Sequence, residues 1–411
     1  MRILYLSQYF PPEVGATQTR AHEMARYLVA QGHQVTVIGE IPNHPKGIIP
    51  PEYRGKLYER ARLDGIDVIR VWVKTSPVKN FRTRMGFYLS YMVNATLAGW
   101  LLARGAYEAV YATSPPLFVG GAGLVLSLLR RIPLVFEVRD LWPESAVVMG
   151  ELSNPRAIDL AEWFEKACYQ RARHIVVVTQ GIQQRLLERG YPPEKLTLIP
   201  NGANTDLFQF QPTAGQTLRT KLGLADKFVV LYAGIHGIAQ GLETIIDAAT
   251  RLVSHTEIHF LFVGEGPVKE QIVALAHERQ LANITFQPEV PRSQIPDFFS
   301  AANVALVPLR RLDLFQDALP SKMFDAWACQ CPTLVTIEGE ARRVLQKAGA
   351  GLFVEPENPT ALAEGIIRLK NDLDSCRQMG INGRQMIIKD YSRQAQARQL
   401  LWLLQQVLAQ K

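Results

Sequence analysis

The sequence predicts an α/β protein made of two doubly wound domains, each built on a parallel sheet. The chain has 411 residues, which is more than one hydrophobic core usually supports. Short apolar segments alternate with amphipathic segments of helical length, which is typical of a parallel sheet covered by helices. The alternation restarts near residue 228, after turn residues concentrated between positions 201 and 213. We therefore expect the two domains to join in that segment.

Short apolar runs predict the strands of the first domain, and longer periodic segments predict its helices. We expect strands at residues 3–6, 34–38, 68–71, 109–112, 134–138 and 175–179, and helices near 17–31, 84–104, 120–130 and 155–170. The first apolar run is too short for a signal peptide and leads directly into a turn at Pro11 and Pro12, so it is expected to be a strand. No uninterrupted apolar run reaches the length of a membrane span.

The second domain repeats this pattern. We expect strands at residues 228–233, 259–263, 284–286, 304–308 and 333–335, and helices near 242–253, 268–279, 295–300 and 321–328, with further helices to the end of the chain. Both series begin with an apolar strand that runs into a loop containing glycine or proline. The two domains are therefore expected to share one architecture.

The composition indicates a globular protein with anionic partners. The net charge is +7 and the isoelectric point is near 9.2, which suits nucleic acid, anionic lipid or phosphorylated small molecules. The four cysteines are Cys168, Cys329, Cys331 and Cys376, and they form no Cys-x-x-Cys pair. We therefore expect neither a disulfide framework nor a zinc site, and a cytoplasmic location fits.

The most informative motif contains two carboxylates eight positions apart, Asp317 and Asp325. Pro320 and Ser321 lie between them and predict a helix that begins at Ser321, with Ser321 as its N-cap and Asp317 in the preceding loop. Lys322 then lies at the positive end of that helix. Carboxylates accept sugar hydroxyl groups, while amides and a lysine bind phosphate oxygens, so the motif suits a polyhydroxyl ligand that carries phosphate. An ordinary capped helix with solvated acids explains the motif equally well.

Two glycine-containing loops follow predicted strands. The loop at residues 11–16 includes Gly15 and Ala16, and a helix that begins nearby would point its N-terminus at a ligand there. The loop at residues 233–242 includes Gly234, His236 and Gly237, and it would cradle a pyrophosphate to which His236 could donate a hydrogen bond. The alternatives are a plain strand-to-helix turn and a solvated loop histidine.

Two further strand ends carry weaker signals. The sequence Val-Gly-Glu-Gly-Pro at residues 263–267 lacks the third glycine and the acidic residue of a dinucleotide fingerprint. Arg139, Asp140 and Trp142 follow the predicted strand at 134–138, where open α/β sheets bind ligands. Trp142 could stack on a sugar, although a solvated strand end is the alternative.

Taken together, these motifs resemble the retaining family-4 glycosyltransferases of GT-B fold. The resemblance spans nearly the whole chain. It rests on the Pro-Pro-x-x-Gly loop, Ile-Pro-Asn-Gly at 199–202 with Phe208, the Tyr-Ala-Gly and Val-Gly-x-Gly strand ends, Ala-Asn-Val-x-x-x-Pro at 302–308, and the two spaced acids. The family normally has two glutamates where this chain has aspartates. The Pro-Ser-Lys form is similar to the bacterial O-antigen and capsule subgroup that includes N-acetyl-L-fucosaminyl transferases.

The chain departs from the family in its second-domain glycine loop. His236 and Gln240 stand where the family usually has arginine and lysine. This departure leaves Lys322, Arg310 or Arg311 as the cation that would neutralise the diphosphate.

The resemblance implies that the two domains bind different substrates. Residues 1–205 would form an acceptor-binding Rossmann-like domain, to which a helix at 393–411 crosses back. Residues 206–392 would form the nucleotide-sugar-binding domain, facing the first across a cleft. The donor would be a nucleotide-sugar, with UDP favoured, and the acceptor a lipid-linked or saccharide molecule. Neither a metal nor a cofactor is expected.

The resemblance also implies roles for individual residues. Asp325 would bind the ribose, Asp317 the hydroxyl groups of the transferred sugar, and Ser321 the donor through the start of its helix. The base would lie beside Glu289 and Val290.

Further roles fall to the first domain and to Lys322. Gly15 and Ala16 would close over the diphosphate, while Arg139 and Asp140 would face the donor and the acceptor. Lys322 would stabilise the leaving diphosphate, as negative charge develops there when the glycosidic bond breaks. Retaining members are thought to use the leaving phosphate as the proton acceptor, so no side-chain nucleophile is assigned.

The predicted helix at residues 85–102 raises the question of membrane contact. It is rich in aromatic residues and is flanked by Lys74, Lys79, Arg82, Arg84 and Arg104, which describes an interfacial anchor on an anionic membrane, such as the inner face of the cytoplasmic membrane. A buried core helix with solvated ends is the alternative.

Two other functions compete with glycosyl transfer. A GT-B epimerase or hydrolase acting on a UDP-sugar would need additional acids and a histidine, and no such cluster is evident. A nucleic-acid-binding protein would account for the positive charge, but the basic residues are scattered and no reader motif is present. We therefore expect no nucleic-acid partner.

Overall fold

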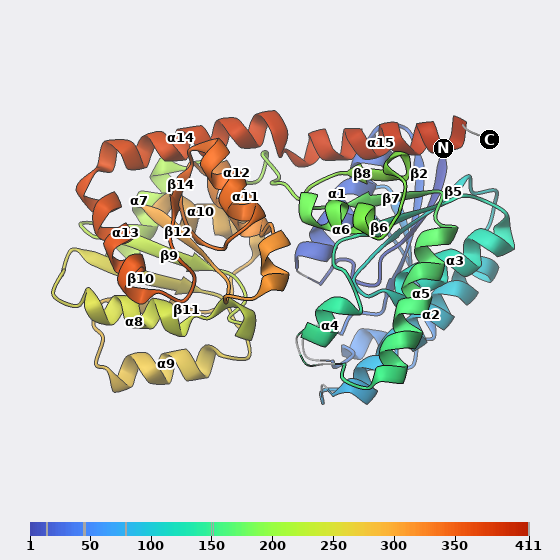
Figure 1. The fold of residues 1–411 in the computed structure, drawn as a ribbon, viewed down its shortest axis with the longest axis horizontal. Coiled ribbons are helices and arrows are strands. Elements are labelled where there is room, and N and C mark those ends of the chain that lie inside the picture. The colour runs from blue at the N-terminus through green and yellow to red at the C-terminus, as the bar shows by residue number, and fades with distance from the viewer. Residues whose placement is uncertain (14, 44–46, 79, 149, 151, 410–411) are drawn as a thin grey trace. The chain divides into compact units, whose positions relative to one another are not determined.

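The computed structural model describes residues 1–13, 15–43, 47–78, 80–148, 150 and 152–409, apart from the side chain of Leu314. The chain divides into two compact units (Figure 1). Unit 1 comprises Met1–Pro200 and Gln394–Lys411, and unit 2 comprises Asn201–Arg393. The boundary follows Pro200, whereas the sequence placed it after residue 205.

Unit 1 contains an eight-stranded sheet in the order β3-β4-β2-β1-β5-β6-β7-β8. Its strands are β1 (Arg2–Leu6), β2 (Gln34–Glu40), β3 (Tyr58–Leu63), β4 (Ile66–Val71), β5 (Ala109–Thr113), β6 (Leu134–Val138), β7 (His174–Val177) and β8 (Leu196–Leu198). All neighbouring pairs are parallel except β3 with β4. Side chains along β1 alternate between two cores, with Leu4 and Leu6 in one and Ile3 and Tyr5 in the other. Both faces of the sheet are therefore covered, which explains the continuous apolar runs.

Helices pack on both faces of this sheet. They are α1 (Ala16–Ala30), α2 (Phe81–Leu97), α3 (Phe118–Arg130), α4 (Glu144–Val148), α5 (Pro155–Arg171), α6 (Gln180–Glu188) and α15 (Arg393–Ala409), with short helical turns η1 (Pro51–Tyr53) and η3 (Pro193–Lys195) and a π-helical segment η2 (Ala98–Leu102). Buried residues of α2, α3, α5 and α6 share one core, and those of α1 and α15 share the other. The last helix of the chain therefore belongs to the first unit.

Unit 2 contains six strands in the order β11-β10-β9-β12-β13-β14, all parallel. They are β9 (Phe228–Ala233), β10 (Ile258–Val263), β11 (Ile284–Gln287), β12 (Val304–Pro308), β13 (Thr333–Thr336) and β14 (Gly351–Phe353). Val229 and Leu231 of β9 face one core, while Val230 and Tyr232 face the other. This sheet is therefore also doubly wound.

Helix α7 precedes the strands of unit 2, and its other helices come between or after them. The helices of this unit are α7 (Pro212–Lys221), α8 (Glu243–Arg251), α9 (Lys269–Glu278), α10 (Ile295–Ala301), α11 (Ser321–Ala328), α12 (Glu340–Ala348), α13 (Pro359–Asn371) and α14 (Leu373–Asp390), with short turns η4 (Ile238–Gln240), η5 (Arg292–Gln294) and η6 (Asp313–Asp317). Across the described residues of both units, no helix is both long and apolar enough to cross a membrane.

Candidate functional site

The helix that carries the acidic motif begins where the sequence predicts, but its cap differs. Pro320 occupies the N-cap of α11, no side chain caps the helix, and Ser321 is its first residue. The prediction that Ser321 caps the helix is therefore wrong, because proline precedes the first helical residue and takes the cap position. Asp317 is also not in an irregular loop, since it ends the helical turn η6.

Lys322 lies in the first turn of α11 and contacts the end of β9. Its Nζ donates a hydrogen bond of 3.1 Å to Tyr232 Oη and lies 4.3 Å from the centre of the Tyr232 ring. A Cβ atom at Gly234 would lie 3.0 Å from this Nζ, so Gly234 leaves room for the ammonium group. Burial lowers the pKa of Lys322 to about 7. Burial is the only cause of this shift, and no ion pair with a described carboxylate opposes it, so an anionic ligand would supply a counter-charge.

Asp325 lies one turn further along α11 and is buried. Its Oδ1 lies 3.6 Å from Nη2 of Arg292, whose guanidinium group also covers the ring of Phe208 at 4.8 Å. Only 7% of Asp325 is exposed, which makes it an unusual acid for an ordinary helix surface. The alternative of solvated acids therefore does not apply to Asp325.

Gly339 sets the position of the turn that carries Asp317. Its φ of +75° is left-handed, and a Cβ atom there would clash with the carbonyl oxygen of Gln316. The start of α12 consequently packs directly on the backbone of η6.

The two glycine loops of unit 2 pack against each other. A Cβ atom at Gly264 would clash with the carbonyl group of Gly234, and one at Gly266 would clash with the backbone of His236. The backbone N–H of His236 donates to Glu265 O at 2.9 Å, and Val268 N donates to His236 O at 3.1 Å. The glycines of the Val-Gly-Glu-Gly sequence therefore permit close contact between two loops.

His236 is not a solvated loop residue. Its side chain is fully buried, and its ring lies 5.5 Å from the ring of Tyr232 and 6.0 Å from that of Phe262. Burial, reinforced by the charge of Lys269, lowers the pKa of His236 to about 4, so the ring is neutral. The ring is thus buried, which excludes the alternative of a solvated loop histidine, and its hydrogen bond to a diphosphate stays a prediction.

The sequence left Lys322, Arg310 and Arg311 as candidates to neutralise the diphosphate. The two arginines form ion pairs with glutamates. The guanidinium group of Arg310 contacts Glu243, Glu357 at 3.2 Å and the carbonyl oxygen of Ile238 at 2.7 Å. Arg311 pairs with Glu355 on the surface, and 68% of its side chain is exposed.

The remaining expected residues of unit 2 lie at loop positions. Gly237 is the N-cap of η4, which leads into α8. Glu289 is exposed after β11, and the adjacent Val290 packs partly against the core. No group of three or more His, Cys, Asp and Glu residues among those described could hold a metal ion.

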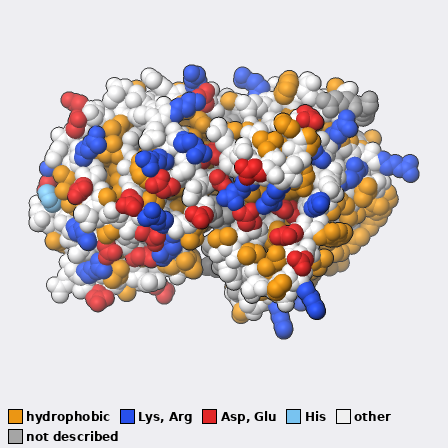
Figure 2. All heavy atoms as spheres, in the orientation of Figure 1, with side chains coloured by type: hydrophobic (Ala, Val, Ile, Leu, Met, Phe, Trp, Pro, Cys, Tyr) orange, Lys and Arg blue, Asp and Glu red, His pale blue; other side chains and the backbone are white. Residues whose placement is uncertain are grey.

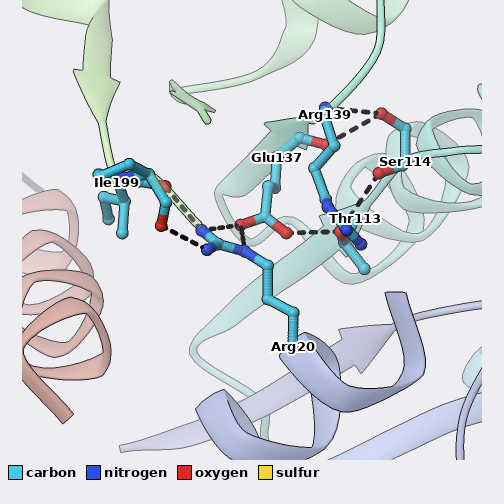
Figure 3. Close-up of polar contacts among 7 residues, drawn as sticks. Arg20, Thr113, Ser114, Glu137, Arg139 and Ile199 are labelled. Atoms are coloured by element: carbon cyan, nitrogen blue, oxygen red, sulfur yellow. Dashed lines mark hydrogen bonds and ion pairs between the residues drawn. The ribbon is translucent and has the colours of Figure 1, made fainter. Parts of the chain in front are cut away.

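In unit 1, a buried ion pair organises the carboxyl ends of the strands (Figure 3). Nη2 of Arg20, on α1, lies 2.8 Å from Oε1 of Glu137, on β6, and both side chains are 1% exposed. Thr113 Oγ1 donates to Glu137 at 2.5 Å, and Arg20 donates to the carbonyl oxygens of Ile199 and Pro200 at 2.8 and 2.7 Å. The pair therefore joins α1, β5, β6 and the segment after β8.

The charges in this pair determine its protonation. Burial by itself raises the pKa of Glu137, but the charges of Arg20 and Arg139 outweigh burial and hold the pKa below its ordinary value. Glu137 is consequently ionised, and Arg20 is held as its counter-ion.

The expected ligand-facing residues of unit 1 lie just beyond this pair. The backbone N–H of Arg139 lies 3.5 Å from Ser114 Oγ, and Ser145 Oγ donates to Asp140 at 2.8 Å (Figure 3 shows Arg139 and Ser114). Burial raises the pKa of Asp140 above its ordinary value. Gly15 and Ala16 are the N-cap and the first residue of α1.

Sequence analysis missed five residues that shape the site. Tyr232, Arg292 and Gly339 carry no local signal for their roles. Arg20 and Glu137 do carry one, because a charged residue inside an apolar helix face or an apolar strand indicates a buried ion pair.

Comparisons with known proteins agree with this architecture. A family described as "Glycosyl transferase 4-like domain" matches residues 15–202, and one described as "Glycosyl transferases group 1" matches residues 216–386. The chain is a glycosyltransferase of the GT-B fold.

Relatives of this glycosyltransferase include bacterial enzymes and solved structures. It is 26% identical over 374 residues to a putative colanic acid biosynthesis glycosyl transferase, WcaI, of Escherichia coli, covering 89% of this chain and 91% of that one. A probable glycosyltransferase of Pseudomonas aeruginosa, WbjE, is 28% identical over 63% of this chain and 64% of its own. Sucrose-phosphate synthase from Thermosynechococcus elongatus has the same fold, with a TM-score of 0.76, 22% identity and full coverage of both chains (100% each). The Anabaena protein HepE in complex with UDP matches with a TM-score of 0.70 and 17% identity, covering 99% of this chain and 100% of that one.

Proposed function

We propose that this glycosyltransferase moves a sugar, with retention of configuration, from a UDP-sugar to a lipid-linked or saccharide acceptor in the synthesis of a cell-surface polysaccharide. The E. coli relative named for colanic acid biosynthesis supports the pathway class, and the Anabaena structure that contains UDP supports the nucleotide. An N-acetylated amino or deoxy sugar is the proposed transferred group, by the resemblance of the Pro-Ser-Lys motif to the O-antigen and capsule subgroup.

The observation that carries the proposal is the environment of Lys322. Its ammonium group lies beside Gly234 and Tyr232, and no described carboxylate balances it. A diphosphate bound at the start of α11 would meet this ammonium group and the backbone amides of the first helical turn. The contacts of Arg310 and Arg311 with glutamates support Lys322 as the neutralising cation.

Asp325 and Asp317 are proposed to divide the rest of the donor between them. Asp325, buried beside Arg292, would accept hydrogen bonds from the ribose. Asp317, at the end of η6, would accept hydrogen bonds from the transferred sugar. Unit 1 would bind the acceptor near Asp140, whose carboxyl group is partly desolvated.

The chemistry proposed for these groups is mainly electrostatic. As the bond between the sugar and the diphosphate breaks, negative charge grows on the leaving oxygens, and Lys322 with the start of α11 stabilises it. No side-chain nucleophile is required, because the leaving phosphate accepts the proton of the acceptor.

A thermal-shift panel of UDP-, GDP- and ADP-sugars tests the nucleotide. We expect UDP-sugars to raise the melting temperature most, because ligands that bind the folded state stabilise it. Stabilisation by GDP- or ADP-sugars alone would overturn the choice of base. Release of free UDP from the donor without an acceptor would instead indicate an epimerase or hydrolase.

We also propose that unit 1 contacts an anionic membrane. The exposed side of α2, η2, α3 and α5 carries large apolar side chains, namely Leu89, Val93, Leu97, Trp100, Leu101, Leu128, Leu129, Leu160 and Trp163. Figure 2 shows apolar side chains gathered over this part of unit 1. Only the inner side of α2 is buried, through Tyr91 and Ala95, so residues 85–102 do not form a fully buried core helix. Of the flanking cations, Lys79 lies outside the described residues.

Vesicle co-sedimentation tests this contact. Replacing Leu97 and Leu101 together by serine should release the protein from anionic vesicles, because it removes exposed apolar area that would enter the interface. The control is Ile388→Ser, at an exposed apolar position on α14 of unit 2, and it should leave binding unchanged. A wild-type protein that ignores anionic vesicles at low salt would overturn the proposal.

A further inference from the structure

A pocket of about 350 Å³ lies within unit 1, beside the strand-end loop that carries Asp140. Its described lining comprises Asn80, Phe81, Arg84, Met85, Tyr88, Trp142, Ala146, Gly150 and Leu152. The first two turns of α2 form one side, and the segment around α4 forms the other. Concave sites at the carboxyl ends of parallel strands are where open α/β sheets bind ligands.

The pocket has a rigid aromatic wall. Tyr88 stacks on Phe118 with ring centres 6.0 Å apart, and Phe118 contacts Trp142 at 5.8 Å and Phe164 at 5.7 Å. These rings hold one another in place, so the wall is formed before a ligand arrives. Aromatic faces of this kind bind alkyl chains and the apolar faces of sugars.

The pocket lining contains one charged side chain among its described residues, and it is a cation. This cation is Arg84, and no acidic side chain is among the described lining residues. The first turn of the 17-residue helix α2 also faces the pocket, and a helix N-terminus favours an anion. The pocket therefore combines apolar walls with a site for negative charge.

The pocket continues into the exposed apolar side of α2. Phe81 and Met85 line it, and Leu89, Val93 and Leu97 follow at intervals of four residues along the same helix. These side chains are 44% exposed at Phe81 and 40–51% exposed from Leu89 to Leu97. Residues four apart lie on one side of a helix, so an apolar stripe leads away from the pocket.

We propose that this pocket binds the phosphate-bearing head of an amphiphile, a long alkyl chain linked through phosphate or diphosphate, with the chain lying along the stripe on α2. Arg84 and the start of α2 contact the phosphate oxygens, and Tyr88 and Trp142 contact the first carbons of the chain or the first sugar. This inference rests on the proposed function, because it makes a lipid-linked acceptor, rather than a free saccharide, the second substrate.

Titration calorimetry with a short-chain probe tests the pocket without any donor. Decyl diphosphate should bind below its micelle concentration, and decyl maltoside and inorganic pyrophosphate should each bind at least about tenfold more weakly, because each offers one half of the recognition. Equal binding of pyrophosphate would overturn the assignment of the alkyl chain, and equal binding of the neutral maltoside would overturn that of the phosphate.

Two arginine variants of α2 test whether decyl diphosphate binds in the pocket. Arg84→Ala should weaken decyl diphosphate at least about tenfold, as expected for a lost charge-assisted contact, and should leave decyl maltoside unchanged. Arg82→Ala is the control, since Arg82 is two positions away on α2 and does not line the pocket. Equal losses in both arginine variants would mean general attraction to a basic surface.

A second variant tests the cavity itself without removing charge. Ala146→Phe should fill the pocket from α4 and abolish binding of decyl diphosphate, with circular dichroism confirming the fold. Retained binding would overturn the proposal. If UDP-sugars bind and decyl diphosphate does not, the pocket assignment is wrong and the proposed transferase function still stands. If decyl diphosphate binds and UDP-sugars do not, only the proposed donor is wrong.

Discussion

Raising the pH from 7 to 9 should weaken the binding of the sugar donor. Burial lowers the pKa of Lys322 to about 7, and in the described structure no carboxylate is close enough to hold its proton. The free protein therefore loses the ammonium charge as the pH rises through 7. A bound diphosphate favours the charged amine and raises its pKa, so donor binding above pH 7 must include the uptake of a proton.

The magnitude follows from the fraction of charged lysine. About half of Lys322 is charged at pH 7 and about one part in a hundred at pH 9, so the dissociation constant should rise about fiftyfold if the bound amine stays charged. A UDP-sugar is a suitable probe, because its diphosphate carries the same charge throughout this range. Calorimetry in two buffers of different ionisation enthalpy measures both the affinity and the number of protons taken up.

Two variants locate this effect. Lys322→Gln should bind the donor weakly at pH 7 and show no further dependence on pH, and its turnover should fall more than its donor affinity. Lys221→Gln, at an exposed position on α7, should keep the wild-type dependence. A flat wild-type affinity between pH 7 and 9, or a slope that survives in Lys322→Gln, would refute the reasoning.

Four further substitutions separate the roles of the site residues. Asp325→Ala should weaken UDP binding by about 1–3 kcal/mol in calorimetry, because ribose hydroxyl groups lose their acceptor, whereas Asp317→Asn should spare UDP affinity and lower turnover; equal effects on both measurements would show that the two acids are wrongly assigned. Glu137→Ala should lower the free energy of unfolding by roughly 3–5 kcal/mol in urea, since it leaves Arg20 buried without its counter-ion, and a loss below about 1 kcal/mol would contradict this. Gly339→Ala should lower turnover with UDP affinity intact, because its φ of +75° and the adjacent backbone of η6 leave no room for a methyl group; unchanged kinetics would mean that η6 tolerates displacement.

Most strands that the sequence revealed have both faces covered, although β11 was also predicted and is only partly buried. β1, β9 and β10 contain apolar runs at 3–6, 228–233 and 260–263, because the side chains of these runs enter one of two cores. β3 escaped prediction because it is an edge strand, Tyr-Glu-Arg-Ala-Arg-Leu, that is antiparallel to β4 and exposes alternate side chains. β8 and β14 are three residues long, which is too short for a pattern to be recognised.

The sequence predicted the candidate site only where the informative residues are close together along the chain. Pro320 and Ser321 indicated the start of α11 to within one residue, and this start placed Lys322 and Asp325 on the helix. The contact of Lys322 with Tyr232 joins residues 90 positions apart, and sequence patterns hold no information about such a pairing. The burial of His236 was missed for the same reason, since it depends on a second loop that packs over it.

The packing of the two glycine loops in unit 2 has a consequence for exchanging parts between enzymes of this fold. Gly264 and Gly266 let the loop after β10 touch the backbone of the loop after β9, at Gly234 and His236. A transplanted β9 loop would therefore lose these contacts, and the two loops would have to be moved together to keep them.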